Sequence, residues 1–128
     1  KLYRELIKAN PENVTVLNNL AWMMAENGKV KEAVTHAQKA ALLAPDRPAV
    51  LDTYGVALLA NNLPKAALSN LEKAHSLAPE DRSIRFHLAQ ACVKVGQPDK
   101  AKTHLEALLG DGKAFPELEQ AKALLKQL

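Results

Sequence analysis

Three residues of the chain have the side-chain types of a nucleophilic triad: Asp52, Ser83 and His87. A Ser hydroxyl becomes a nucleophile when a His within hydrogen-bond reach takes its proton and a carboxylate orients that His. Such a site also needs donors for the oxyanion, and the sequence supplies no strained turn or Gly-rich loop to provide them. We therefore expect Asp52 and His87 to form a hydrogen bond or to be solvated. The sequence predicts no enzyme and no catalytic residue.

The residue types that bind metals do not combine into a site either. Glu72 and His75 form one Glu-x-x-His pair, whereas a di-iron bundle needs two such pairs and two further carboxylates. His36 and His104 belong to units of the chain that are too far apart to share an ion. Cys92 is the only cysteine, and we expect it to be a small buried hydrophobic residue. The sequence thus predicts no metal and no cofactor.

The elements that must position these residues follow from a period of 34 residues. Pro11, Pro45 and Pro79 are spaced by that interval. Other positions repeat with the same spacing: Leu20, Tyr54 and Leu88; Ala21, Gly55 and Ala89; Gly28, Asn62 and Gly96; Ala33, Ala67 and Ala101. A period of this length with helix–turn–helix content is typical of a stacked array, in which each unit buries its apolar face against its neighbours.

Each repeated residue type has a physical reason. Small residues such as Ala21 and Gly55 let two helices approach closely. Gly28, Asn62 and Gly96 stand where a first helix must end in a left-handed conformation, which Gly and Asn tolerate best. A proline then suits the first turn of the second helix, and another proline after that helix ends it. The pattern predicts pairs of antiparallel helices and no strands.

These residue types in this order resemble the tetratricopeptide repeat over essentially the whole chain. We expect a single all-α domain, an α-solenoid of about three full repeats with a partial N-terminal helix and a C-terminal capping helix. The expected divisions are 1–13 for the second helix of a truncated repeat, 14–47, 48–81 and 82–115 for the three repeats, and 116–128 for the capping helix. The interrupted first repeat indicates a fragment of a longer repeat protein.

The resemblance implies a protein-binding groove lined by the first helix of each repeat. The residues expected to face it are Asn18, Asn19, Trp22, Asp52, Thr53, Val56, Ser83, Phe86, His87 and Gln90. Trp22 among amides suits a peptide groove, because an aromatic anchor supplies contact area and amides bond the partner's backbone. The alternative is that Trp22 packs on a neighbouring helix or on a repeat that is missing upstream. Relatives that grip the carboxylate tails of chaperones use a set of Lys, Asn and Arg residues in this groove. Here those places hold Asn18 and Trp22, Thr53, and Ser83 and His87, so that ligand is not expected.

Charge and hydropathy argue against other partner classes. The 17 Lys and Arg residues exceed the 14 Asp and Glu residues by only three, and they are scattered over both helices of every repeat. A nucleic-acid surface would gather basic residues on one face with aromatic residues between them. The longest apolar run is far shorter than the roughly 20 residues that cross a bilayer. We expect a protein or peptide partner, no nucleic acid and no membrane span.

Several short phrases resemble the C-terminal end of long bacterial repeat lipoproteins tied to exopolysaccharide production and to the PEP-CTERM sorting system. These phrases lie at 18–22, 51–55, 84–89, 112–117 and 123–126. The resemblance implies a periplasmic or outer-membrane-associated scaffold in an envelope export system. We therefore expect a non-enzymatic adaptor that binds a peptide or helix. The alternative is an architectural spacer that self-associates through its N-terminal helix.

Overall fold

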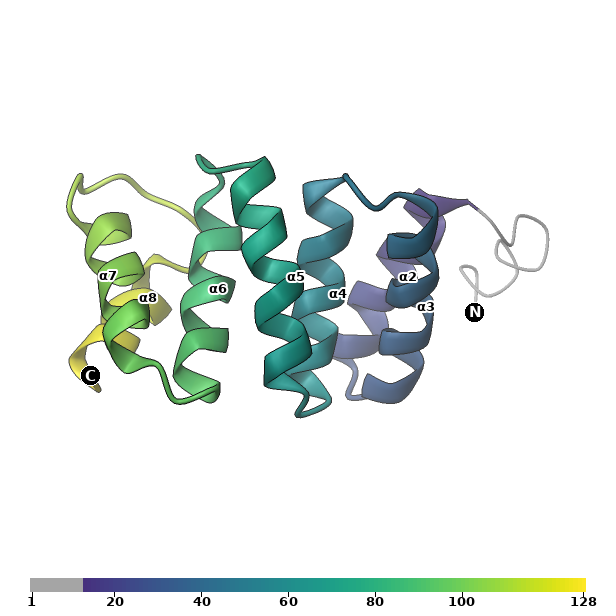
Figure 1. The fold of residues 1–128 in the computed structure, drawn as a ribbon, viewed down its shortest axis with the longest axis horizontal. Coiled ribbons are helices and arrows are strands. Elements are labelled where there is room, and N and C mark those ends of the chain that lie inside the picture. The colour runs from purple at the N-terminus through teal and green to yellow at the C-terminus, as the bar shows by residue number, and fades with distance from the viewer. Residues whose placement is uncertain (1–12) are drawn as a thin grey trace.

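The computed structural model describes residues 13–128, and every regular element in that range is an α-helix (Figure 1). The helices are α2 (Val14–Glu26), α3 (Val30–Leu43), α4 (Pro48–Ala60), α5 (Pro64–Leu77), α6 (Arg82–Lys94), α7 (Pro98–Leu109) and α8 (Leu118–Lys126). The helix expected before Asn13 lies outside the described residues. Asn13 itself caps α2, because its side chain accepts a hydrogen bond from the amide of Val16.

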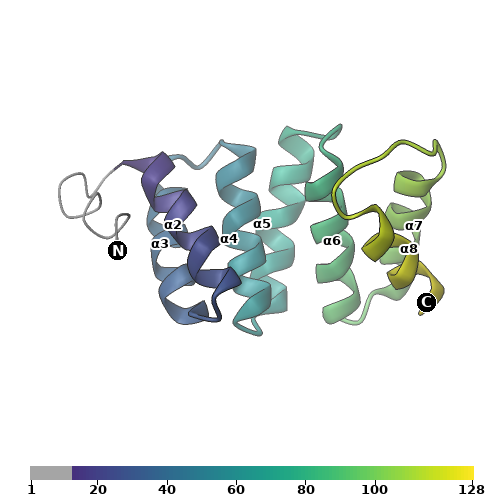
Figure 2. The same ribbon diagram turned by 180° about the vertical axis from the view of Figure 1, so that it is seen from behind.

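The helices form antiparallel pairs that follow one another along a single axis (Figures 1 and 2). α2 packs on α3, α4 on α5 and α6 on α7, and each pair also packs on the next pair in the chain. The first helices α2, α4 and α6 lie on one side of the array, and the second helices lie on the other. The all-α solenoid expected from the sequence is confirmed.

The turn within each pair has the left-handed residue that the period predicts. Gly28, Asn62 and Gly96 have φ angles of 79°, 61° and 83°. The amide that follows each of them bonds back to a carbonyl in the last turn of the first helix, for example from Lys29 to Met24 at 2.8 Å. This bond satisfies a carbonyl that the helix end would leave free, so the turn residues fix where the first helices end.

Prolines set several of the other helix ends. Pro64 and Pro98 begin α5 and α7, where the missing N–H costs no hydrogen bond. Ala44 and Ala78, which precede prolines, both leave helical geometry with φ of −137° and ψ of 69°. The second helices α3 and α5 therefore end just ahead of these alanines.

The core combines small and larger apolar residues from both helices of each pair. Ala21, Ala33, Ala67 and Ala101 are completely buried, as are Leu17, Leu71 and Leu105. Cys92 is also buried in the core, as expected. The interior therefore follows the 34-residue period, with residues at equivalent positions of successive pairs buried in a series of core clusters.

The last helix begins two residues later than the sequence indicated. Pro116 and Glu117 form a turn closed by the amide of Leu118 and the carbonyl of Phe115, and α8 starts only after it. Ala121 is fully buried against the core of α6 and α7, and Phe115 packs on the same core. α8 covers this end of the array, as Figure 2 shows.

Candidate protein-binding groove

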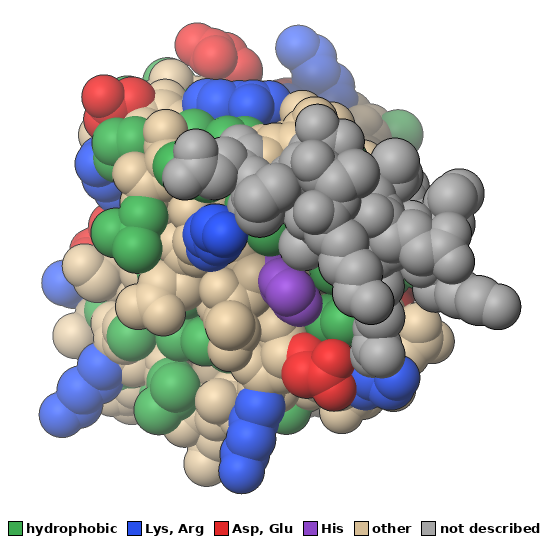
Figure 3. All heavy atoms as spheres, turned by 90° about the vertical axis from the view of Figure 1, so that its right-hand side faces the viewer, with side chains coloured by type: hydrophobic (Ala, Val, Ile, Leu, Met, Phe, Trp, Pro, Cys, Tyr) green, Lys and Arg blue, Asp and Glu red, His purple; other side chains and the backbone are tan. Residues whose placement is uncertain are grey.

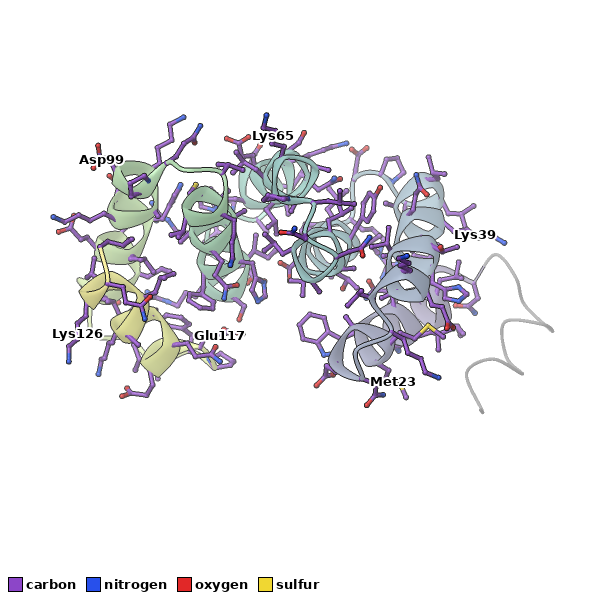
Figure 4. The ribbon with its side chains drawn as sticks, turned by 90° about the horizontal axis from the view of Figure 1, so that it is seen from below. Met23, Lys39, Lys65, Asp99, Glu117 and Lys126 are labelled. Atoms are coloured by element: carbon purple, nitrogen blue, oxygen red, sulfur yellow. The ribbon has the colours of Figure 1, made fainter. Side chains whose placement is uncertain are left out.

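A groove of about 590 Å³ opens between the first helices α2, α4 and α6. Its wall is formed by Asn18, Asn19, Trp22, Met23, Ala49, Asp52, Thr53, Asp81, Ser83 and Ile84. Figure 4 shows Met23 and Glu117 on opposite sides of this opening, while Lys65 and Asp99 project from the far side of the array. The groove is thus a feature of the side formed by the first helices.

The period brings residues from three separate helices to this groove. Asn18, Asn19 and Trp22 come from α2, Asp52 and Thr53 from α4, and Ser83 from α6. All six were expected to face a groove. Thr53 contributes little polarity, because it is buried and its hydroxyl donates to the carbonyl of Ala49 in its own helix.

Four of the expected groove residues do not line it. Val56, His87 and Gln90 are absent from its wall. Phe86 was expected to face a partner, and this expectation is wrong, because only 2% of the residue is exposed and it packs in the core shared with Leu88 and Leu105. Adjacent helical residues point about 100° apart, so Phe86 turns inward beside a residue that faces the groove side.

His87 lies behind the groove wall and links α6 to α4. It is 7% exposed, and its Nδ1 donates to Asp52 Oδ1 at 2.7 Å. On the other side of the ring, Nε2 lies 3.9 Å from Glu117 Oε2. The expected hydrogen bond between Asp52 and His87 is therefore present, with a second carboxylate nearby.

Ser83 does not complete a triad with these two residues. Its hydroxyl donates to Glu117 Oε1 at 2.7 Å. A nucleophile needs a base within hydrogen-bond reach, and the base here, His87, is bonded to Asp52 on one nitrogen and faces Glu117 with the other. The arrangement ties α6 to α4 and to the turn before α8.

The surroundings of His87 favour its charged form. Burial lowers the pKa of His87, but the hydrogen bond and charge of Asp52 and the charges of Glu117 and Asp81 outweigh burial, so that the pKa is raised. These carboxylates come from three different segments of the chain. His87 therefore lies among acidic groups beneath the groove wall.

Trp22 combines the two roles that the sequence left open. Its ring centroid lies 6.4 Å from that of His87 at an interplanar angle of 52°, so the indole packs across from α2 toward α6. At the same time 38% of the residue is exposed, and its neighbour Met23 is 40% exposed. The two side chains form an apolar patch that is held in place from behind and open in front.

The sequence reasoning missed several residues of the site. Met23, Ala49, Asp81 and Ile84 line the groove, and Glu117 holds Ser83 and faces His87. A signal for Asp81 was its place directly before α6, since its carboxylate caps that helix by accepting from the amide of Ile84. Glu117 stands one period after Ser83, but it follows an irregular loop, so spacing alone did not place it.

A pair of histidines lies between the second helices α5 and α7. His75 of α5 and His104 of α7 meet edge to face with centroids 5.6 Å apart. Arg85 Nε donates to His104 Nδ1 at 3.0 Å, and burial followed by the charge of Arg85 lowers the pKa of both histidines. Within residues 13–128, no three His, Cys, Asp or Glu residues are grouped closely enough to hold a metal ion.

None of the helices within 13–128 has the length and apolarity needed to cross a membrane. On the end of the array formed by α2 and α3, the visible Lys and Arg side chains stand at separate points (Figure 3).

Comparison with known proteins supports the repeat assignment. A family model described as tetratricopeptide repeat matches residues 58–128, and a second one with the same description matches residues 2–35. No curated protein sequence matches the chain.

Solved structures share the fold at low sequence identity. A crystal structure of MamA is 22% identical, with a TM-score of 0.81 over 96% of this chain and 70% of that one. The type III secretion translocator chaperone SycD of Yersinia enterocolitica is 19% identical, with a TM-score of 0.76 over 89% of each chain. SycD in complex with a peptide of the translocator YopD is 19% identical, with a TM-score of 0.73 over 87% of this chain and 88% of that one. With its family match over more than half of the sequence and its array of helix pairs, the chain belongs to the tetratricopeptide repeat family.

Proposed function

We propose that the chain is a non-enzymatic scaffold whose concave groove binds a peptide or helix of a partner protein. The observation that carries this proposal is the open apolar patch of Trp22 and Met23, set among the amides of Asn18 and Asn19. Exposed aromatic anchors beside backbone-bonding amides are the usual composition of a protein-binding hot spot.

The shape of the site agrees with a peptide ligand. The groove crosses three helices and is fixed by the Asp52–His87 hydrogen bond beneath it, so a ligand would meet a surface that is already ordered. SycD, which has the same fold, has been solved with a peptide of its translocator bound. The likeness makes peptide binding a reasonable function for this groove, and the residues that bind here are our proposal.

We further propose that the partner belongs to a bacterial envelope export or exopolysaccharide system. The support is the resemblance of the phrases at 18–22, 84–89 and 112–117 to the envelope-associated repeat lipoproteins described above. Those phrases include residues of the groove and the turn that holds it, so the resemblance falls on the proposed binding site.

A photo-crosslinking pair tests the groove directly. A benzophenone amino acid replaces Met23 in the groove, and in a matched control it replaces Lys65, which projects from the opposite side (Figure 4). Irradiation in the native host should crosslink an envelope protein to the Met23 variant and not to the Lys65 variant. Crosslinking from both positions or from Lys65 alone would contradict the groove proposal.

The identified partner is then titrated with purified protein. Trp22 is the only tryptophan of the chain. When the partner peptide itself lacks Trp, a change in tryptophan fluorescence therefore reports that the groove is occupied. The substitutions Trp22→Ala and Asp52→Ala should each weaken binding, and calorimetry measures the change in affinity. If both leave the affinity unchanged while deletion of residues 1–10 abolishes it, the partner binds elsewhere.

The alternative of a self-associating spacer has a separate readout. Sedimentation of the purified chain without any partner should show one species over a wide range of concentration if the groove proposal holds. Concentration-dependent assembly that disappears on deletion of residues 1–10 would instead favour self-association through the N-terminal segment.

A further inference from the structure

Among the described residues, the charged side chains that line the groove are all of one sign. Asp52 and Asp81 line it, and its ten described wall residues include no Lys or Arg. This composition departs from that of the whole chain, which carries a net charge of +3. A concave surface of one sign attracts ligands of the opposite sign, because the low-dielectric walls concentrate the field in the opening.

The histidine beneath the wall does not cancel this negative charge. Protonated His87 is bonded to Asp52 and lies near Glu117, and Asp81 also acts on it electrostatically. Three carboxylates therefore surround a single imidazolium. The region stays negative whichever protonation state His87 adopts.

The two arginines of α6 are occupied on its other side. Arg82 donates to the carbonyl of Leu108 at 3.0 Å and forms an ion pair with Asp111. Arg85 donates to His104 of α7. Neither guanidinium group is therefore directed at the carboxylates of the groove, and Lys94 at the other end of the helix does not line it.

A further group in the groove suits a cationic guest. The indole of Trp22 is partly open, and a Lys or Arg over such a ring gains electrostatic attraction from the aromatic face.

We propose that the segment bound in this groove is basic and inserts a Lys or Arg side chain between the Trp22 indole and the carboxylates of Asp52 and Asp81. The aliphatic part of that side chain and an adjacent apolar residue would cover Met23. The inference rests on the proposed function and adds to it the charge of the partner segment, for which charge complementarity is the basis.

A phage-displayed library of random peptides, selected on the purified protein, is the probe. We expect the selected peptides to share a Lys or Arg next to an apolar residue. In a synthetic peptide of the selected sequence, replacing that residue by Gln should weaken binding on the order of tenfold in calorimetry.

Isosteric variants test the acidic wall. Asp81→Asn keeps a good N-cap for α6 while removing its charge, and Asp52→Asn preserves side-chain size. Each should weaken the basic peptide on the order of tenfold and reduce the salt dependence of binding. Glu72→Gln on α5 is the matched control, because it removes one negative charge from an exposed site that does not line the groove, and it should leave affinity unchanged.

The outcomes separate this inference from the function on which it rests. Selected peptides without basic residues, or equal affinity for the two Asn variants and the wild type, would overturn the basic-segment proposal. If selected peptides without basic residues still bind Trp22→Ala more weakly than the wild type, the proposal that the groove binds a peptide stands. Peptides that bind all of these variants equally would overturn both proposals.

Discussion

His87 supports the groove wall and also makes the stability of the fold depend on pH. Its raised pKa means that the folded chain holds a proton on this ring more tightly than the unfolded chain does. The stabilisation is therefore complete below the unfolded pKa of about 6.5 and is lost as pH rises through the higher folded pKa. His75 and His104 have lowered pKa values and act in the opposite direction, because their contribution is lost as pH falls below about 6.5.

Replacing Asp52 by Asn should remove most of the decrease in unfolding free energy that the wild type shows as pH rises through the pKa of His87. The variant loses a charge-assisted hydrogen bond, which costs about 1–3 kcal/mol at pH 6. Because the neutral amide no longer favours the imidazolium, the free energy of unfolding should then change less between pH 6.5 and 8 than in the wild type. Urea unfolding across this range measures both effects.

Glu72→Gln serves as the control for this pH profile, since it removes a carboxylate from an exposed position on the opposite layer. It should retain the wild-type slope. A wild-type slope in Asp52→Asn would show that the proton on His87 is not held by Asp52.

The sequence predicted part of this residue network. Asp52 and His87 are expected partners because the period places them on first helices of adjacent repeats. Glu117 completes the network from a turn after an irregular loop, where periodic spacing carries no information about side-chain direction. The inward position of Phe86 was likewise not predicted. Because α6 packs on neighbouring helices on more than one side, apolar residues occur on several of its faces, and the sequence does not show which of them points to the groove.

At the scale of elements, the close packing of α4 on α5 depends on Gly55. A Cβ added at Gly55 would lie 2.5 Å from Cγ of Leu71, which is itself fully buried. The equivalent positions in the other pairs hold Ala21 and Ala89, so the glycine is specific to the α4–α5 pair. A side chain at position 55 is disfavoured by the lack of space, since the φ angle of Gly55 is not positive.

Gly55→Ala should therefore destabilise the fold although it improves helix propensity. Ala in a helix interior gains about 0.5–1 kcal/mol over Gly, whereas overpacking a core costs about 1–3 kcal/mol. Leu71→Ala alone should cost about 2–5 kcal/mol through the cavity it leaves. In Gly55→Ala/Leu71→Ala the new methyl group enters that space, so the double variant should be more stable than the sum of the single costs implies. Denaturant unfolding of all four proteins gives the coupling, and additive costs would rule out the clash.

Helix ends were the most predictable elements, because each has a local cause. The left-handed residues at Gly28, Asn62 and Gly96 end the first helices, and prolines mark the starts of α5 and α7 and follow the ends of α3 and α5. The start of α8 was predicted two residues too early. Pro116 is compatible with a helix start, but the chain uses it in a turn that brings Glu117 to Ser83.

At the scale of the molecule, the array has no single centre. Each helix pair packs on its neighbours, and within the described residues the α2–α3 pair does not pack on α7 or α8. In such a stack, stability is close to a sum of unit and interface contributions, so a local perturbation weakens with distance along the axis. The three separate core clusters at the α2–α5 end agree with this organisation.

Ala121→Glu tests how far a perturbation travels along the stack. Ala121 is the fully buried residue of α8, so a carboxylate there should undock this helix, whereas Ala123→Glu places the same charge on the exposed side of α8 as a matched control. Hydrogen exchange should accelerate on the order of tenfold or more in α8 and α7 of the Ala121 variant, less in α6, and not in α2 or α3. The Ala123 variant should exchange like the wild type. Equal acceleration in every helix would mean that the molecule opens as one cooperative unit, and the Glu117 contacts that support the groove would then be lost only by global unfolding.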